Sequence, residues 1–189
     1  MYMSVVNSGF TLADSPIAAA RWSKSVDNGA EAPLGIGEIG QGDADFNFLV
    51  TPKTLSGAGV LGCEAISLPP EGWALRLDEV AFPIGAIALR HTHSGSGWRH
   101  LVTGSLRIEA GHDTSVMNAG DSWFEPAHSP VRAVALQGRG DTRFVRCMVI
   151  PLADVGQSTF QLCAPEDADL PRLQMTHRHF DHVVQVDAG

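Results

Sequence analysis

The chain has 189 residues, the size of one globular domain, since a domain typically spans about 100–200 residues. Its 13 Lys and Arg residues stand against 21 Asp and Glu residues, which gives a net charge of −8. This balance argues against a nucleic-acid or anionic-membrane binder, because such proteins need clustered basic side chains. No stretch approaches the ~20 apolar residues of a membrane span. We therefore expect neither a nucleic acid nor a membrane as partner.

The first 45 residues are predicted to be a mostly irregular N-terminal arm. Only residues 16–22, with the sequence PIAAARW, have helical character. The loop-like stretch that follows contains Gly35, Gly37 and Gly40 in the pattern GxGxxG. A dinucleotide site needs that pattern between a buried strand and a helix. Neither flank is present, so we interpret the stretch as a loop.

From about residue 46 to about residue 186, the sequence predicts a succession of strands. Along Trp73–Phe82, apolar side chains at Trp73, Leu75 and Leu77 alternate with Ala74, Arg76 and Asp78, which predicts one face in a core and one in water. Further short strands are expected at 86–91, 98–104, 105–110, 121–126, 131–136 and 142–151. Turn-forming Gly, Pro, Asn and Asp residues separate them, a spacing typical of an all-β sandwich or barrel.

The three cysteines indicate a reducing compartment. Cys63, Cys147 and Cys163 are odd in number, lie far apart and form no CxxC pair, so neither a disulfide framework nor a zinc knuckle is predicted. The N-terminal residues carry no basic side chain ahead of their mildly apolar stretch, unlike a signal peptide. We expect a cytoplasmic location.

The strongest chemical signal is the pair His91 and His93. Two residues apart on a strand, they project from the same face, and their imidazoles can share one cation. The alternative is a pair of polar residues that line a ligand cavity without any ion.

Two motifs around this pair resemble those of the cupin family. Residues 85–104 resemble the first cupin motif, with matches at Gly85, His91, His93 and Gly104. Residues 120–130 resemble the second, with matches at Gly120, Asp121, Phe124, Pro126 and Pro130. The resemblance implies a cupin-like jelly-roll β-barrel of two antiparallel sheets over residues 46–189, with the N-terminal arm of residues 1–45 packed outside it. It also implies a homodimer.

The sequence departs from the family at two metal-ligand positions. Gly97 stands where the family has a Glu, and Val131 stands where it has its third His. His128, three residues before Val131, and Glu125 are the candidates to complete a site with His91 and His93 for a divalent ion such as Fe, Ni, Mn or Zn. Two imidazoles alone would bind such an ion weakly.

Three further residues are candidate ligand-binding residues: Arg99, His100 and Trp123. Successive side chains in a strand point to opposite faces. If position 97 faces the cavity, Arg99 therefore faces inward and His100 outward. A buried guanidinium would seek a carboxylate, from the protein or from an anionic ligand. The alternative is a surface Arg99, because strand register is easily displaced by one residue.

The C-terminal stretch holds a second cluster of histidines. Residues 176–182, which include His177, His179, Asp181 and His182, resemble the THxHxDH motif of metallo-β-lactamase-like hydrolases. That chemistry needs further His and Asp ligands and helices, which this chain does not show. We interpret the stretch as a strand with surface or edge histidines.

Two functions from different classes remain open at this point. The first is a metal-dependent enzyme, such as a dioxygenase, isomerase or lyase, that acts on a small organic acid, with the ion as Lewis acid and template. The second is a non-catalytic protein that binds or senses a small molecule and has lost part of the metal site. The resemblance alone does not choose, because one fold hosts many chemistries.

Overall fold

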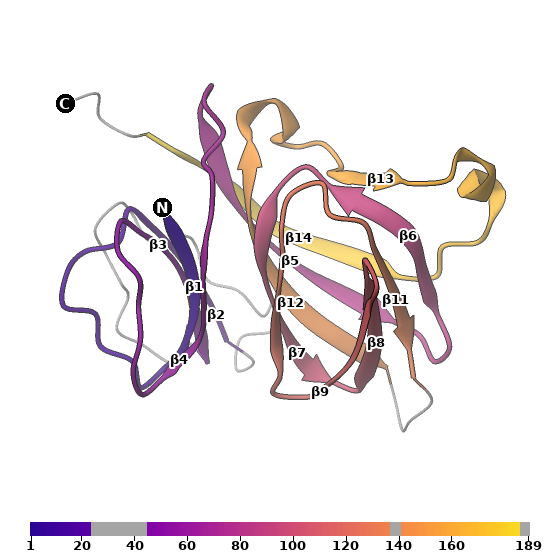
Figure 1. Ribbon diagram of the computed structural model, residues 1–189, viewed down its shortest axis with the longest axis horizontal. Helices are drawn as coiled ribbons and strands as arrows, with labels where there is room; N and C mark the ends of the chain where they lie inside the picture. The colour runs from indigo at the N-terminus through magenta and orange to yellow at the C-terminus, as the bar shows by residue number, and fades with distance from the viewer. Residues whose placement is uncertain (24–44, 137–140, 186–189) are drawn as a thin grey trace.

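The structure is a computed structural model, which describes residues 1–23, 45–136 and 141–185. Its regular structure is almost entirely strand, with two short 3₁₀ helices, η1 (Leu152–Asp154) and η2 (Pro165–Asp169). The strands form three antiparallel sheets (Figure 1). The prediction of an all-β fold is confirmed. Within the described ranges, no helix is both long and apolar enough to cross a membrane.

Two five-stranded sheets carry the cavity described below. The β5 sheet consists, in spatial order, of β10 (Ser122–Glu125), β7 (Ser96–Thr103), β12 (Thr142–Pro151), β5 (Trp73–Phe82) and β14 (Met175–Val184). The β6 sheet consists of β13 (Phe160–Leu162), β6 (Ile87–His93), β11 (Val131–Ala135), β8 (Ser105–Ala110) and β9 (Asp113–Asn118).

The strand order identifies the architecture. From β5 to β12 the chain crosses repeatedly between the sheets and produces the orders 10-7-12-5 and 6-11-8-9, those of an eight-stranded double-sheet jelly roll. The predicted jelly roll of two antiparallel sheets is therefore confirmed. In the described part of the chain, the two sheets remain separate ladders and do not join into one closed barrel.

The third sheet, called the N-terminal sheet, consists of β2 (Ala18–Trp22), β3 (Phe46–Thr51), β1 (Tyr2–Asn7) and β4 (Val60–Ala65). The structure thus differs from the expectation of a mostly irregular arm, since two stretches within residues 1–23 are strands. The short apolar run at 16–22 pairs with β3 instead of forming a helix. Such a run cannot be assigned to helix or strand from its pattern alone. The GxGxxG stretch lies outside the described residues.

The N-terminal sheet covers the outer face of the β5 sheet (Figure 1). Trp98 Nε1 donates a hydrogen bond to the Met3 carbonyl oxygen over 2.8 Å, and Trp22 Nε1 donates one to Glu79 Oε1 over 2.7 Å. The Trp98 ring lies so close to Gly62 in β4 that any side chain there would overlap it. Glycine is therefore required at this contact.

This covering buries both faces of β5. Trp73, Leu75 and Leu77 pack toward the N-terminal sheet, as the alternation predicts. Arg76 and Asp78, which were expected to face water, are each only 1% exposed. The expectation of a solvated face is wrong because β5 is a central strand between two packed layers. Charged side chains on that face must find partners inside the protein.

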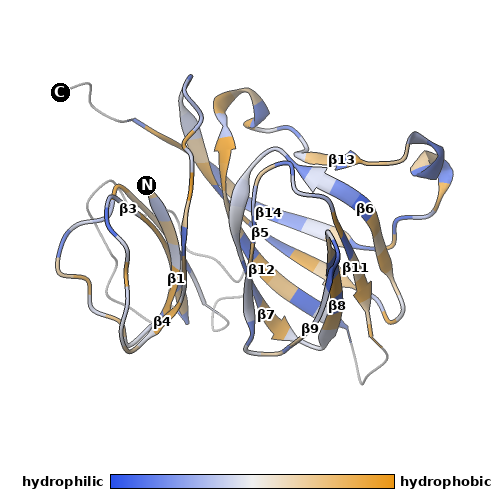
Figure 2. Ribbon diagram, in the orientation of Figure 1, coloured by the Kyte–Doolittle hydropathy of each residue, from blue (hydrophilic) through white to orange (hydrophobic). Residues whose placement is uncertain are grey.

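The half of β6 that lies against β13 is hydrophilic, whereas its other half is hydrophobic (Figure 2). The hydrophilic half contains His91 and His93, which pair in the ladder with Leu162 and Phe160. Strand β6 therefore places a polar end and an apolar end along one wall of the jelly roll.

Strand β14 lies at the edge of the β5 sheet and holds the C-terminal histidine cluster. His177 is exposed, His179 Nε2 lies 3.0 Å from Glu79 Oε1, and Asp181 forms an ion pair with Arg76 over 2.6 Å. His179 and Asp181 therefore have separate partners on β5, and the His177 ring packs edge-on against His179 with centroids 4.6 Å apart, in agreement with the interpretation as an edge strand.

Glu79 joins three elements and makes stability depend on pH. Burial raises the pKa of Glu79, but hydrogen bonds from His179 and Trp22, together with the charge of Arg143, outweigh it and lower the pKa below the ordinary 4.5. When folding lowers the pKa of a carboxyl group, that group stabilises the folded protein at pH values above its unfolded-state pKa. This contribution is lost as the pH falls through the folded-state pKa.

We therefore expect the free energy of unfolding to fall as the pH drops below about 4.5 and Glu79 takes up its proton. Urea unfolding at several pH values from 7 to about 3 measures this. The variant Glu79→Gln should show a smaller decrease, because its side chain has no proton to gain in this range. Equal pH slopes in the two proteins would contradict the assignment.

Candidate functional site

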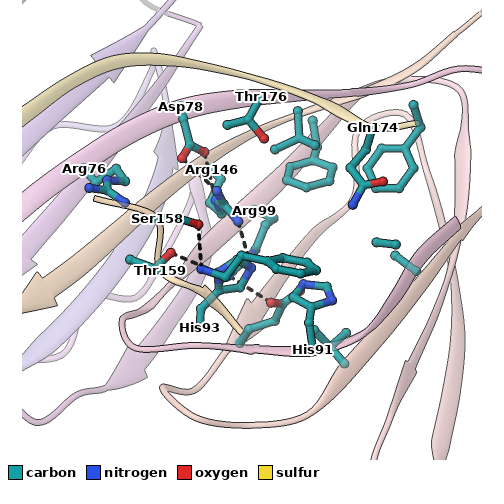
Figure 3. A pocket seen from close by; sticks show the side chains of 18 of the residues that line it. Arg76, Asp78, His91, His93, Arg99, Arg146, Ser158, Thr159, Gln174 and Thr176 are labelled. Carbon is teal, nitrogen blue, oxygen red and sulfur yellow. Dashed lines mark hydrogen bonds and ion pairs between the residues drawn. The ribbon is translucent and has the colours of Figure 1, made fainter. Parts of the chain in front are cut away.

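A cavity of about 350 Å³ lies between the β5 sheet and the β6 sheet. Its apolar wall comes from both sheets and consists of Val80, Phe82, Ala88, Ile108, Trp123, Val131, Ala133 and Phe144. Its polar wall consists of Arg76, Asp78, His91, His93, Arg99, Glu125, Arg146, Ser158 and Thr159 (Figure 3). The remaining lining residues are partly or largely exposed, and we call them the mouth of the cavity: Phe160, Arg172, Gln174, Thr176 and Arg178. The cavity is therefore amphipathic, and its size is within the usual range for small-molecule sites.

The rings of His91 and His93 both face this cavity. Their centroids lie 4.9 Å apart in an edge-on arrangement, and each residue is 6% exposed. His91 Nδ1 lies 2.6 Å from the carbonyl oxygen of Leu89, and Phe160 stacks on its ring at 4.3 Å. Because a carbonyl only accepts, Nδ1 of His91 carries the proton and Nε2 keeps its lone pair.

His93 is held by a guanidinium group. Arg146 Nη1 lies 2.9 Å from His93 Nε2, while Arg146 Nε and Nη2 each donate to the Asp78 carboxylate over 2.8 Å. A guanidinium has only donors, so His93 Nε2 accepts and its Nδ1 carries the proton, which it donates to Thr159 Oγ1 over 3.0 Å. Both ring nitrogens of His93 are therefore engaged by protein groups.

The two imidazoles are neutral at pH 7. Burial lowers the pKa of His93 far below its ordinary value, and the charges of Arg146 and Arg99 lower it further. Burial also lowers the pKa of His91, although its bond to the Leu89 carbonyl and the Glu125 carboxylate oppose this. Their neutrality is a consequence of enclosure beside fixed positive charges.

Arg99 faces the cavity and finds its carboxylate within the protein. It is 1% exposed, forms an ion pair with Glu125 over 2.9 Å and donates to the Gly97 carbonyl oxygen. Trp123 Nε1 donates to the same carboxylate over 2.8 Å. Burial lowers the pKa of Arg99 to about 10, which still leaves it charged at pH 7. The structure places Arg99, Glu125 and Trp123 together, as one bonded group.

Two predicted site residues lie elsewhere. His128 is exposed in the turn before β11, has a positive φ of 60°, and does not belong to the cavity lining. Its backbone N–H donates to the His93 carbonyl oxygen, so the turn geometry turns the ring outward. His100 packs on Phe46 of the N-terminal sheet, with ring centroids 3.7 Å apart. The structure thus corrects the prediction that His100 is a ligand-binding residue. It agrees with the alternation of side chains along the strand, which directs His100 outward.

The two positions that lack the family's ligands are structural. Val131 pairs with His91 in the ladder and contributes to the apolar wall. A Cβ at Gly97 would overlap the backbone carbonyl oxygen of Cys147 in the neighbouring strand β12. Glycine at 97 therefore allows β7 and β12 to approach closely, and a longer side chain does not fit without a backbone shift.

We expect Gly97→Ala to destabilise the protein by about 2 kcal/mol, the typical cost of overpacking a tight site. Guanidinium chloride unfolding of both proteins measures the loss. Gly111→Ala is not a matched control, because Gly111 has a positive φ that disfavours Ala. Ala133→Gly, at a buried position in β11, measures instead the cost of an ordinary exchange between Ala and Gly in a strand. A Gly97→Ala protein as stable as the wild type would show that the strands are not in close contact.

A divalent metal, as the cupin resemblance implies, does not fit the residues present. One imidazole lone pair accepts from Arg146, and Glu125 is paired with Arg99. Within the described ranges, no group of three or more His, Cys, Asp or Glu side chains is placed to hold an ion. The polar wall also carries three guanidinium groups, Arg76, Arg99 and Arg146, against the two carboxylates Asp78 and Glu125, and this surplus of positive charge opposes a further cation.

Sequence reasoning missed Arg146, Asp78 and Arg76 as cavity residues. Each lies on the inner face of a long apolar strand, and the signal was their position among buried alternating residues. That signal can be interpreted only when the N-terminal sheet is known to cover the outer face of the β5 sheet.

No protein-family model matches the chain, and no curated protein matches it. Among solved structures, it is similar to an RmlC-like cupin from Shewanella frigidimarina, at 25% identity and a TM-score of 0.38, over 43% of this chain and 70% of that one. It is also similar to the DMSP lyase DddQ from Ruegeria pomeroyi, at 19% identity and a TM-score of 0.43, over 49% of this chain and 45% of the lyase. KdgF from Halomonas matches at 24% identity and a TM-score of 0.39, over 47% of this chain and 78% of that one.

These matches concern the fold only. The protein has the double-sheet jelly roll found in cupins, which its own strand order establishes. The fold that the two sequence motifs implied is thereby confirmed.

Proposed function

We propose that this protein binds a small organic anion with an apolar body in the cavity between the β5 and β6 sheets. The observation that carries the proposal is the division of one cavity into an apolar wall and a wall with several arginines. A ligand whose hydrocarbon or aromatic part contacts Phe82, Phe144 and Trp123 would direct its anionic group toward Arg146.

The polar wall has a surplus of hydrogen-bond donors. A guanidinium has five N–H groups, and three of those of Arg146 have partners, which leaves two for a ligand. Arg172 at the mouth lies over the Phe160 ring at 5.5 Å and forms no ion pair with the described residues. An acceptor-rich group such as a carboxylate suits both arginines.

Two hydrogen-bond acceptors of the protein at the cavity favour a ligand that also carries a hydrogen-bond donor. His91 lines the cavity, and its Nε2 keeps its lone pair because Nδ1 carries the proton. Gln174 Oε1 is buried at the mouth and has no hydrogen-bond partner among the described residues. A hydroxyl or amino group on the ligand would satisfy one of them, since a buried polar atom without a partner is costly.

Thermal unfolding with a series of carboxylates tests the proposal. Aliphatic and aromatic carboxylates of increasing size should raise Tm, and their primary amides should not. At a ligand concentration of 100 times Kd, the stabilisation is about 2.7 kcal/mol. Arg172→Met should weaken the response, and Arg107→Met, a half-exposed arginine paired with Glu109 outside the cavity, should not. No Tm increase with any carboxylate would refute the proposal.

A metal-dependent enzyme is the alternative, and the inward-facing His91 and His93 are its only support among the described residues. Stoichiometric iron, nickel, manganese or zinc in protein purified without a polyhistidine tag would favour it. The homodimer and the cytoplasmic location stay predictions, which light scattering and cell fractionation can test.

A further inference from the structure

The position at which a cupin-like site would hold a metal ion is taken by an arginine. His93 would coordinate an ion through a ring nitrogen with a free lone pair. Its Nε2 instead accepts from Arg146 over 2.9 Å, and its Nδ1 donates to Thr159 (Figure 3). An ion at His93 would have to displace the guanidinium.

Displacing that guanidinium is strongly unfavourable. Arg146 makes two parallel hydrogen bonds to Asp78, the geometry of the strongest charge pairs. The Asp78 side chain is 2% exposed, so the departure of Arg146 would leave a buried carboxylate without its partner. Asp78 lies on β5 and Arg146 directly opposite on β12, so the backbone ladder itself sets the pair.

We infer that the guanidinium of Arg146, held by Asp78 and His93, is the cationic centre of this cavity in place of a metal ion, and that the ligand's anionic group binds to it directly. The ligand part of this inference rests on the proposed function. Arg146 lines the cavity, and two of its five N–H donors have no partner among the described residues. His91, with its free Nε2, lies beside His93 and would accept a hydrogen bond from the same ligand.

The metal part is tested with Co²⁺ added to untagged wild-type protein. Its absorption spectrum reports histidine coordination, and isothermal titration reports binding. We expect no stoichiometric Co²⁺ binding. The ¹⁵N spectrum should show His93 in the form protonated at Nδ1, unchanged by equimolar Co²⁺ or Zn²⁺. Stoichiometric binding that disappears in the double variant His91→Ala, His93→Ala would overturn the inference.

The ligand part is tested with the carboxylate that raises Tm most. We expect its Kd to be unchanged by a metal chelator. In the double variant Asp78→Asn, Arg146→Gln, which keeps the pair neutral and hydrogen-bonded, Kd should rise by at least about 30-fold. His93→Ala should raise Kd by less than about tenfold, since the Asp78 bonds still hold the arginine. Thermal unfolding of each variant without ligand verifies that it folds.

The two proposals fail in different ways. Carboxylate binding that a chelator abolishes, or that the Asp78→Asn, Arg146→Gln variant retains at full affinity, would overturn the Arg146 centre and leave the proposed function standing. If no carboxylate binds the wild type, the proposed function and the ligand part fall together, and the Co²⁺ measurement decides the metal part on its own.

Discussion

Replacing Asp78 with Ala should destabilise the protein by about 3–5 kcal/mol, because it leaves Arg146 buried without its counter-charge. Burial by itself lowers the pKa of Arg146, and Asp78 more than offsets this, so that the net pKa is raised. Without Asp78, the folded state must bear the desolvation of a guanidinium. Equilibrium urea unfolding at pH 7 measures the loss.

Two comparisons isolate the cause. The double variant Asp78→Leu, Arg146→Met should recover most of the lost stability, since replacing a buried ion pair with apolar groups of similar size is often neutral. Glu109→Ala removes a carboxylate from the partly exposed contacts with Arg107 and Arg132, and should cost much less, because solvent screens exposed ion pairs. An Asp78→Ala loss no larger than that of Glu109→Ala would show that the pair is solvated.

Trp98→Ala should destabilise the protein by about 3–5 kcal/mol, the usual range for truncating a buried large aromatic residue. Trp98 is 6% exposed and lies between the β5 sheet and the N-terminal sheet, against Gly62 and Phe124. Its removal creates a void there and leaves the carbonyl oxygen of Met3 without its side-chain donor. Guanidinium chloride unfolding measures the change.

Trp98→Phe retains most of the apolar contact and loses the indole N–H, so it should cost less than Trp98→Ala. Val116→Ala, at a side chain that is 51% exposed on β9, serves as the surface control and should fall within about 0.5 kcal/mol of the wild type. If Trp98→Ala matches that control, the N-terminal sheet does not pack on the jelly roll as described.

The two predictions are connected through the N-terminal sheet. By covering the outer face of β5 and β12, it buries most residues of both strands on both faces. The charges on their inner faces, Asp78, Arg76 and Arg146, are then enclosed and must pair with one another or with neighbours. The layer outside the jelly roll thus helps to create the electrostatics of the cavity inside it.

Local sequence patterns were sufficient for much of the jelly roll. The period-two alternation and the Gly- and Pro-rich turns located most strands from 73 to 151, because both signals depend on a few neighbouring residues. Parity also placed His91, His93 and Arg99 toward one cavity and His100 away from it. The strand expected at 98–104 begins two residues earlier, since β7 starts at Ser96.

Contacts between distant segments settled the rest. Residues 2–7 and 18–22 form strands because β3 and β4 offer partners, and no local pattern reports a partner more than twenty residues away. The guanidinium on His93 depends on the register of β12 against β5, which brings position 146 opposite position 78. Whether the two imidazoles contact a metal ion or an arginine depends on that register and on the N-terminal sheet that covers these strands. Only the tertiary structure determines both.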